Sequence, residues 1–431
     1  MALQFLKKTG ILMLVTVLVC TVMLLLMAGS FLLPTEGMKA HVQNTLSTFE
    51  QEGLYPFVND EQGSMRDNYI DALNLSQAIV GTQDTDLISC VVKNPFYSGP
   101  DTAAPVENLK AALDAPESVT LADTEYRFFN GHLIFQKPLL TVMGYTGIRM
   151  FCFYACLLGT AWMGYLMYKR KLGRFIAPFM LSILFLRPYT VWTNMSFTLI
   201  YVSMLIPCIV MLMIRKETLK ERAWLLFGIT GSMTFCQVQN YFQLMAFGMP
   251  LMMYFLIAGI PEKPGELLKN TVNLFAAWMI GYAGAMLFKW TVYSVATGEN
   301  IFSEMIRHAL WRTNDEEGSR MATIARNAQI AFGSIWWDVI EIGFIGYTVF
   351  RRIRKRTKIR LSAAEILLLL ASVLFAVGRL AVFSNHSMIH APFTYRVLMM
   401  PVLAFNLWIT GTKAPAESSP ESPVFRGIRL T

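Results

Sequence analysis

The sequence predicts an all-α polytopic membrane protein with about ten transmembrane helices and a long extracytoplasmic first loop. Hydrophobic residues make up 54% of the 431 residues and charged residues only 15%, whereas a soluble domain usually carries about 25% charged residues. Apolar runs of membrane-spanning length recur along the chain, and short basic clusters separate them. Such clusters fix membrane topology, so the net charge of +8 does not indicate a nucleic-acid partner.

The first apolar run predicts an N-terminal transmembrane anchor within residues 1–33. Lys7 and Lys8 precede an apolar stretch of ~20 residues, which is long enough to cross a bilayer. The stretch exceeds the ~7–15 apolar residues of a signal peptide, so we expect an anchor that is not cleaved. The lysines should be cytoplasmic, which sends the chain outward after this anchor.

Residues 34–141 are predicted to form an extracytoplasmic loop domain. The segment is polar and too long for a loop without structure of its own. Cys90 is its only cysteine, so we expect no disulfide inside it. Asp67 and Asp71 are four residues apart, a spacing that puts both carboxylates on one face of a helix.

Residues 142–411 are predicted to form a multi-span transmembrane domain of a cell-membrane protein. The tail at 412–431 is rich in Pro, Ser and Glu and is expected to be disordered and cytoplasmic. By the positive-inside rule, the basic clusters expected in the cytoplasm lie at 169–171, 215–222 and 351–356. Besides the anchor, the expected spans lie near 142–168, 172–187, 195–214, 223–239, 241–260, 271–290, 329–350, 362–383 and 391–411.

This topology gathers polar residues on the outer face, where ionisable groups at membrane depth usually mark a site or pathway. Arginine and histidine suit a phosphate or pyrophosphate, because a guanidinium offers a bidentate fork of donors. A carboxylate can act as general base toward a sugar hydroxyl, or can hold a divalent metal ion against a phosphate. The predicted catalytic residues are Asp67 and Asp71, and the predicted substrate-binding residues are Arg127, Asn130, His132, Arg149, Arg187, Asn240, His386, His390 and Arg396.

Each group also has a structural interpretation. Arg149 and Arg187 can extend to lipid headgroups, and histidines such as His386 and His390 can cap a loop. Two aspartates can be solvated helix residues, and amides at a helix junction, Asn240 among them, commonly hydrogen-bond neighbouring helices. The functional interpretation therefore depends on these groups occurring together on one side of the membrane. No Gly-rich phosphate loop or HExxH motif supports an ATP-driven or zinc-protease mechanism.

Two stretches resemble signatures of polytopic membrane proteins of Gram-positive bacteria. Residues 67–73, with the sequence Asp-Asn-Tyr-Ile-Asp-Ala-Leu, resemble a DNYTDALML-like signature. Residues 126–132 (Tyr-Arg-Phe-Phe-Asn-Gly-His), followed by 137–140 (Lys-Pro-Leu-Leu) and by Ile-Arg at 148–149, resemble a Y-x-RYWHG…RPLL…IR pattern. Here Phe129 and Asn130 replace the Trp and His that precede the glycine. The similarity is strongest over residues 60–150.

More broadly, the layout is similar to that of GT-C glycosyltransferases. That resemblance implies an N-terminal anchor, an acidic residue in a long first outer loop, and a sugar donor linked to a lipid phosphate. It implies that Asp67 or Asp71 is the catalytic base, and that the arginines and histidines hold the donor phosphate. Glu36 follows the first span more closely, where the family usually has its acidic residue, and is an alternative base.

The leading functional hypothesis is transfer of a sugar from a polyprenyl-phosphate carrier to a cell-surface glycan at the outer face of a bacterial membrane. The expected partners are membrane lipid, the lipid-linked sugar and the glycan acceptor. A divalent metal ion is the one candidate cofactor. A transporter or flippase is the second hypothesis, but it predicts charges near mid-span, whereas most charges lie at span ends. A non-enzymatic scaffold for polysaccharide assembly is the third.

Overall fold

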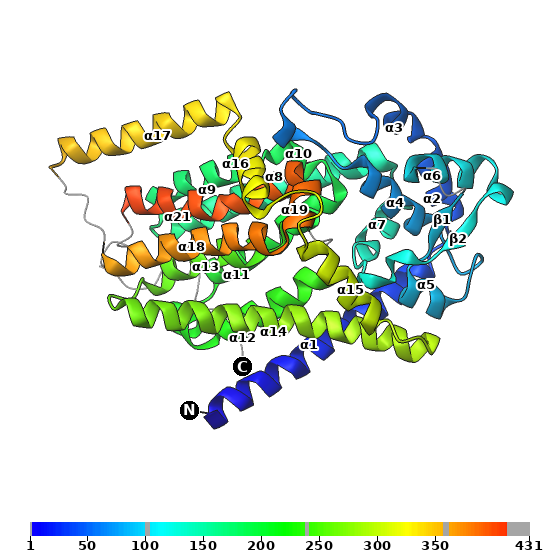
Figure 1. The fold of residues 1–431 in the computed structure, drawn as a ribbon, viewed down its shortest axis with the longest axis horizontal. Coiled ribbons are helices and arrows are strands. Elements are labelled where there is room, and N and C mark those ends of the chain that lie inside the picture. Colours follow the sequence, from blue (N-terminus) through cyan, green and yellow to red (C-terminus); the bar gives the residue numbers. More distant parts are fainter. Residues whose placement is uncertain (1, 100–103, 238–240, 357–361, 412–431) are drawn as a thin grey trace.

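The computed structural model describes residues 2–99, 104–237, 241–356 and 362–411 (Figure 1). Within these ranges the chain is almost entirely helical, as predicted. One short antiparallel pair joins β1 (Phe96–Ser98) to β2 (Thr120–Ala122). Asn240 and the tail at 412–431 lie outside the described residues.

Six helical segments among the described residues are long and apolar enough to cross a membrane, which indicates a multi-pass membrane protein. The helices α16 (Arg320–Ala331) and α17 (Ile335–Arg354) meet at 79° and make a seventh span if counted as one. The six are α1 (Ala2–Phe31), α8 (Tyr145–Lys169), α11 (Met195–Met213), α14 (Pro264–Thr297), α18 (Ala363–Val382), and the combined run of α20 (Ala391–Thr394), η5 (Tyr395–Leu398) and α21 (Met399–Thr410).

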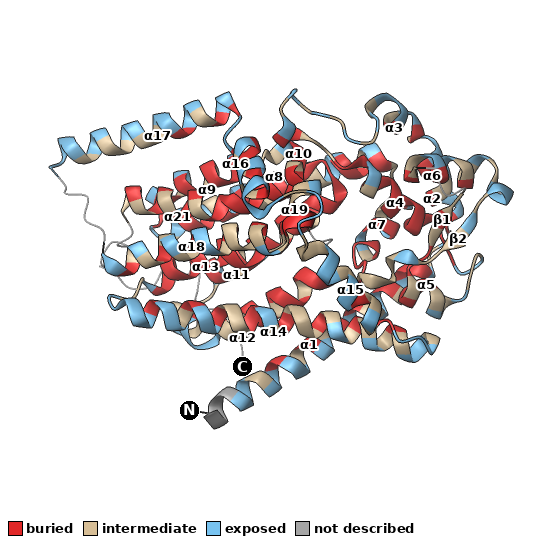
Figure 2. Ribbon diagram, in the orientation of Figure 1, coloured by how far each residue is buried: buried red, intermediate tan, exposed pale blue. Residues whose placement is uncertain are grey.

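The other expected spans correspond to elements that do not meet the same criteria. The span expected at 172–187 is occupied by η4 (Gly173–Phe175) and α9 (Ile176–Phe185), which are short. The span at 241–260 contains α13 (Met245–Ala258). Residues 223–237 of the span expected at 223–239 lie in α12 (Lys216–Gln237), and the last two lie outside the described residues. Every residue of α13 is buried (Figure 2), as expected for a helix that is apolar on all sides. The count of ten spans remains a prediction.

Close helix packing organises the membrane domain around α12 and α14. A Cβ atom added to Gly231 would collide with the carbonyl of Trp278, and one added to Gly281 would collide with the carbonyl of Gly228. Small residues at such contacts let helix backbones approach each other within a membrane. The α12–α14 pair therefore requires glycine at these positions.

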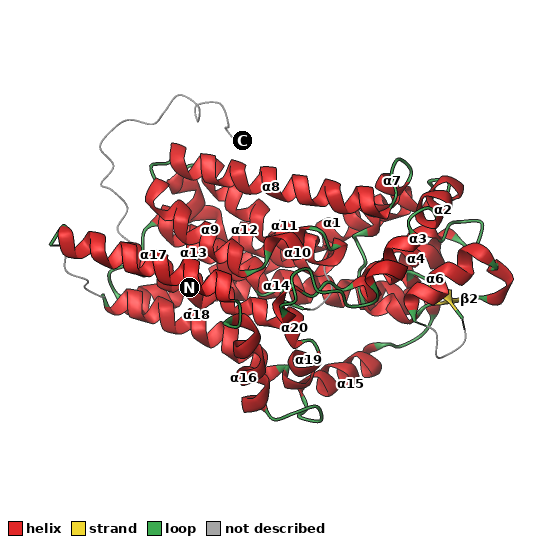
Figure 3. Cartoon of the chain, turned by 90° about the horizontal axis from the view of Figure 1, so that it is seen from above, coloured by secondary structure: helices red, strands yellow, loops and turns green. Residues whose placement is uncertain are grey.

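Short helices between α1 and α8 gather at one end of the molecule, as the two views of Figures 1 and 3 agree. Their bounds are α2 (Glu36–Gln43), α3 (Leu46–Glu52), η1 (Gln62–Ser64), α4 (Asn68–Ile79), α5 (Leu87–Lys93), α6 (Pro105–Asp114), η2 (Pro116–Ser118), η3 (Thr124–Arg127) and α7 (Leu133–Leu140). The remaining short helices are α10 (Pro188–Trp192), α15 (Phe302–Thr313) and α19 (Ser384–Ile389).

Two buried lysines help to fix these short helices: Lys137 of α7 contacts α4 within the group, and Lys289 contacts α5 from outside it. The Lys137 ammonium donates hydrogen bonds of 2.7 and 2.8 Å to the carbonyls of Ala78 and Val80 at the end of α4. Lys289 of α14 donates a 2.6 Å bond to the carbonyl of Val92 near the end of α5. A cation at a helix C-terminus satisfies carbonyls that have no partner within the helix. These contacts help to hold α4 and α5 in place.

Candidate functional site

Asp67 begins α4 and is buried, with 1% of its surface exposed. As the N-cap residue, it accepts a 3.1 Å hydrogen bond from the backbone N–H of Ile70, the usual role of aspartate at this position. Its second carboxylate oxygen accepts a 2.7 Å hydrogen bond from the Tyr241 hydroxyl. Asp67 therefore connects α4 to the segment between α12 and α13.

Asp71 lies one turn later and has a different set of partners. Its carboxylate accepts a 2.9 Å hydrogen bond from the Tyr145 hydroxyl. It also accepts bonds of 3.2 and 3.4 Å from the backbone N–H groups of Met195 and Ser196, at the start of α11. Helix N-termini favour negative charge. Asp71 thus joins α4 to α8 and α11, and its carboxylate oxygens are already used in holding these helices together.

Burial raises the pKa of both carboxyl groups. The pKa of Asp67 rises to about 7, although the hydrogen bonds from Tyr241 and Ile70 oppose the shift. The pKa of Asp71 rises to about 6, and the charge of Arg149 is the largest opposing influence. A carboxyl group with a pKa near neutrality can both take up and release a proton at physiological pH. Asp67 is the better placed of the two for such a role.

The substitution Asp67→Asn should change how stability depends on pH. Because the folded-state pKa is raised from 3.8 to about 7, the stabilising contribution of this proton is complete at low pH and is lost as the pH rises through about 7. Asn has no proton to release. The variant should therefore gain stability relative to the native protein as the pH rises from 3.8, the pKa of an unperturbed aspartate, to about 7, the pKa in the folded state. Thermal unfolding in detergent at a series of pH values measures this; a difference that stays constant with pH contradicts it.

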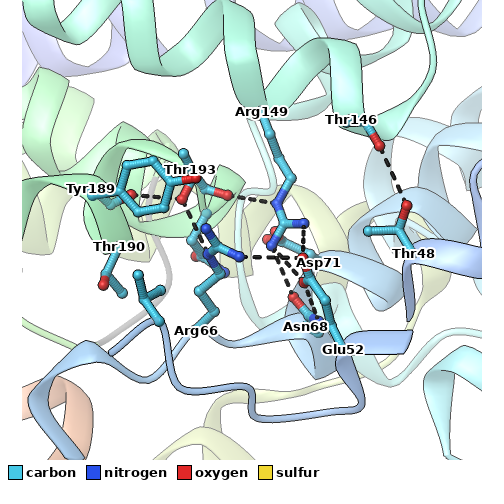
Figure 4. Close-up of polar contacts among 12 residues, drawn as sticks. Thr48, Glu52, Arg66, Asn68, Asp71, Thr146, Arg149, Tyr189, Thr190 and Thr193 are labelled. Carbon is cyan, nitrogen blue, oxygen red and sulfur yellow. Dashed lines mark hydrogen bonds and ion pairs between the residues drawn. The ribbon is translucent and has the colours of Figure 1, made fainter. Parts of the chain in front are cut away.

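Arg149 is buried and forms an ion pair with the partly exposed Glu52 (Figure 4). Its guanidinium donates two 2.9 Å hydrogen bonds to the two carboxylate oxygens of Glu52 and one of 2.8 Å to the carbonyl of Thr193. Arg66 and Asn68 also donate to Glu52, at 3.2 and 3.0 Å. Burial opposes ionisation of Glu52, but these partners outweigh it and lower its pKa. The charge of Arg149 is therefore balanced within the protein.

Arg187 and Arg396 also have structural partners. The Arg187 Nε lies 3.3 Å from a carboxylate oxygen of Glu61. The guanidinium of Arg396 is fully buried and donates to the carbonyls of Leu186, Pro392 and Gly63, at 3.0, 3.0 and 2.9 Å. Backbone carbonyls therefore satisfy the hydrogen-bond donors of the Arg396 guanidinium. Both arginines thus connect chain segments that are distant in sequence.

Asn130 and His132 lie between η3 and α7. Asn130 has a positive φ of 57°, and its side-chain amide donates a 3.1 Å hydrogen bond to the carbonyl of Glu125. Burial lowers the pKa of His132 to about 3, so its imidazole is neutral at physiological pH and brings no positive charge to a phosphate.

Arg127 forms a second polar group with residues of α15. Its guanidinium donates a 2.6 Å hydrogen bond to Nε2 of His308 and lies 3.6 Å from a carboxylate oxygen of Glu125. Arg312, one turn after His308 on α15, lies over the ring of Phe128, 5.8 Å from its centroid. The Nε of Arg312 is buried without a hydrogen-bond partner among the described residues.

His386 and His390 lie near this group, with ring centroids 4.7 Å apart. Arg379, near the end of α18, contacts Nδ1 of His386 at 3.3 Å and donates a 3.0 Å hydrogen bond to the carbonyl of Tyr241. Burial lowers the pKa of His390 to about 4, and the charges of Arg312 and Arg379 act in the same direction. Burial and these positive charges thus keep the His390 imidazole neutral at physiological pH.

We call Arg127, Arg312, Arg379, His386 and His390 the cationic cluster. Burial lowers the pKa of Arg312, Tyr282 opposes this shift, and the charge of Arg127 reinforces it. The cationic cluster thus contains three guanidinium groups. One of them, that of Arg127, lies 3.6 Å from a carboxylate oxygen of Glu125. Grouped guanidinium donors favour an anion such as a phosphate.

Tyr241 connects the cationic cluster to Asp67. Its hydroxyl donates to Asp67, its carbonyl accepts from Arg379, and its ring lies 5.1 Å from that of His390, measured between centroids. A carboxylate and the cationic cluster therefore share one neighbouring residue. This combination is the candidate functional site.

The structure divides the predicted site residues. Asp67 belongs to the candidate site with Arg127, His386 and His390. The residues with structural partners are Asp71, Arg149, Arg187 and Arg396. Asn130 and His132 belong to neither set, and Asn240 lies outside the described residues. Glu36 is exposed at the start of α2. Within the described residues, no group of three or more His, Cys, Asp or Glu side chains is arranged to hold a metal ion.

Sequence reasoning did not select four residues of the candidate site. These are Tyr241, Glu125, Arg312 and Arg379. A signal existed for Arg312, because it stands four residues after His308 and therefore on the same helix face. Arg379 is a charge near the end of an apolar run, a feature that often has a functional reason. Tyr241 carried no comparable signal.

Fold and site together define an all-helical, multi-pass membrane protein with a buried carboxylate beside a cationic cluster. No protein-family model, curated protein or solved structure matches the chain in the comparisons.

Proposed function

We propose that this chain is an integral-membrane glycosyltransferase of the GT-C type. It would transfer a sugar from a polyprenyl-phosphate-linked donor to a cell-surface glycan at the outer face of the membrane. The observation that carries the proposal is the connection, through Tyr241, between Asp67 and the cationic cluster. Glycosyl transfer from a lipid phosphate needs both parts: a base for the acceptor and groups that stabilise the leaving phosphate.

Asp67 is the proposed general base. Its carboxylate takes the proton of an acceptor hydroxyl, whose oxygen then forms a bond to the anomeric carbon of the donor sugar. A pKa of about 7 leaves a substantial ionised fraction at neutral pH and makes the carboxylate a stronger base than an exposed aspartate. Asp71 is the weaker candidate because it accepts three hydrogen bonds, from Tyr145 and from two N–H groups of α11, whereas Asp67 accepts two, one of them from the residue that also contacts the cationic cluster.

The cationic cluster is the proposed donor-phosphate site. As the bond between the anomeric carbon and the phosphate oxygen breaks, negative charge grows on the departing polyprenyl phosphate. The guanidinium groups of Arg127, Arg312 and Arg379 stabilise that charge, because charge-assisted hydrogen bonds are stronger than neutral ones. His386 and His390, neutral at physiological pH by their lowered pKa values, contribute N–H donors.

The proposed orientation puts the N-terminus in the cytoplasm and residues 34–141 outside. The basic end of α17, with Arg351, Arg352 and Arg354, lies at the opposite end of the molecule from the short helices α2–α7 (Figure 1). Basic residues concentrate on the cytoplasmic side of membrane proteins. This separation supports an outer location for the candidate site.

Replacing Arg312 with Gln should raise the KM for the lipid-linked donor by about tenfold or more, because loss of a hydrogen bond to a charged group costs about 1.5–3 kcal/mol. The measurement is sugar transfer by the purified chain in nanodiscs, using a polyprenyl-phosphate-linked sugar. Arg307→Gln is the matched control, since Arg307 is exposed on the same helix.

Two outcomes would contradict the proposed function. One is an equal effect of the two arginine substitutions, which removes the phosphate role from Arg312. The other is movement of the lipid-linked sugar across a proteoliposome membrane without transfer, which identifies a transporter or flippase instead.

A further inference from the structure

Two tyrosines present exposed aromatic rings beside the candidate site. Tyr55 follows α3 and Tyr69 lies in the first turn of α4; they are 45% and 38% exposed. Their ring planes are parallel within 7°, and the ring centroids are 6.4 Å apart. The two faces therefore share one orientation, and we call the pair the tyrosine platform.

A continuous series of aromatic contacts connects the tyrosine platform to the proposed base. The ring of Tyr55 lies 6.4 Å from that of Phe393, and Phe393 lies 5.2 Å from Tyr241, both measured between centroids. Tyr241 in turn donates to Asp67, and Tyr69 follows Asp67 by two residues. The tyrosine platform is therefore linked to Asp67 through Phe393 and Tyr241.

The electrostatics of the platform favour a neutral occupant. Burial raises the pKa of Tyr55 to about 12, and the charge of Asp67 acts in the same direction. The pKa of Tyr69 is raised by burial, and by the charges of Glu125 and Asp67. Both phenols stay protonated and can donate and accept hydrogen bonds. When Asp67 is ionised, its negative charge would repel an anionic molecule at this position.

We infer that the tyrosine platform docks a neutral pyranose ring of the acceptor glycan. An aromatic face is negative, so it attracts the weakly positive axial C–H groups on the flat side of a sugar ring. The phenol hydroxyls bind sugar hydroxyls at the ring edge. This inference rests on the proposed function, because it assigns the acceptor side of the same site. Tyrosine is also common at lipid headgroups, but the loop carrying Tyr55 exposes the polar residues Asn59 and Asp60.

Saturation-transfer NMR on the full chain in nanodiscs tests this inference, with cellotetraose as the neutral probe and tetragalacturonate as its anionic counterpart. Irradiation of aromatic protons should produce signals from cellotetraose and weaker ones from tetragalacturonate. Tyr55→Ala and Tyr69→Ala should each weaken cellotetraose binding by about tenfold, since each removes one stacking face. Tyr55→Phe should retain most of the binding. Tyr347→Ala is the control, because Tyr347 is exposed on α17.

Three results would overturn the tyrosine platform: no cellotetraose signal with the native chain, signals unchanged in both alanine variants, or signals only from lipid headgroup protons. A failure of the tyrosine platform can be distinguished from a failure of the proposed function. A chain that binds cellotetraose through Tyr55 but transfers no sugar contradicts the function and leaves the platform intact. A chain that transfers sugar with an unchanged acceptor KM in Tyr55→Ala contradicts the platform alone.

Discussion

Substitution of Asp67 with Asn is expected to lower the rate of sugar transfer by about 10²- to 10⁴-fold, the usual contribution of a general base. Asn keeps an oxygen that can cap α4 and an amide near the Tyr241 hydroxyl, but it cannot take up the acceptor proton. The measurement is the amount of native glycan made by cells whose only copy of the protein is the variant. Unchanged glycan would remove Asp67 from the catalytic role.

Asp71→Asn separates catalysis from folding in the same experiment. Each Asp71 oxygen accepts a hydrogen bond from a backbone N–H group of α11, so an amide NH₂ in place of either oxygen would set a donor against a donor. We expect less folded protein in the membrane, with the remaining protein still active per molecule. Full abundance combined with loss of glycan would instead assign the catalytic role to Asp71.

The substitution Arg149→Leu should destabilise the protein by less than the about 3–5 kcal/mol found when one partner of a fully buried ion pair is removed, because the Glu52 side chain is 26% exposed. Glu52 would lose its two 2.9 Å hydrogen bonds, leaving a partly buried carboxylate with only Arg66 and Asn68 as partners. The measurement is unfolding of the purified chain in mixed detergent, monitored by tryptophan fluorescence.

The matched variant is Glu52→Gln combined with Arg149→Leu. Because it removes the unbalanced charge as well, the double variant should recover part of the lost stability. Two results would contradict a coupled ion pair. One is an Arg149→Leu variant as stable as the native chain; the other is a double variant whose loss of stability equals the sum of the losses of the two single variants.

The coarse fold was predictable because membrane helices are specified locally. Apolar length identifies α1, α8 and α11 without knowledge of their neighbours. The spacing of Asp67 and Asp71 likewise suits the helix α4 that they begin. Span number was harder to assign, since α9 and α13 are apolar but short, and composition alone does not distinguish a span from a buried helix.

The site was less predictable because its contacts join residues far apart in sequence. Positive charge near a span end marked Arg149 and Arg396, but not whether carboxylates or carbonyls inside the protein already satisfy them. The partner of Arg149 is Glu52, 97 residues away, and that of Asp67 is Tyr241, 174 residues away. Spacing and topology indicate which residues share one side of the membrane, whereas only packing decides which of them meet.

A structure of the chain in nanodiscs with bound polyprenyl phosphate tests the central claim most directly. We predict density for the phosphate within about 3 Å of guanidinium nitrogens of Arg312 and Arg127, the distance of a charge-assisted hydrogen bond. The sugar-binding side should face Asp67. A phosphate bound at Arg149, or at the basic end of α17, would contradict the assignment of the cationic cluster as the donor site.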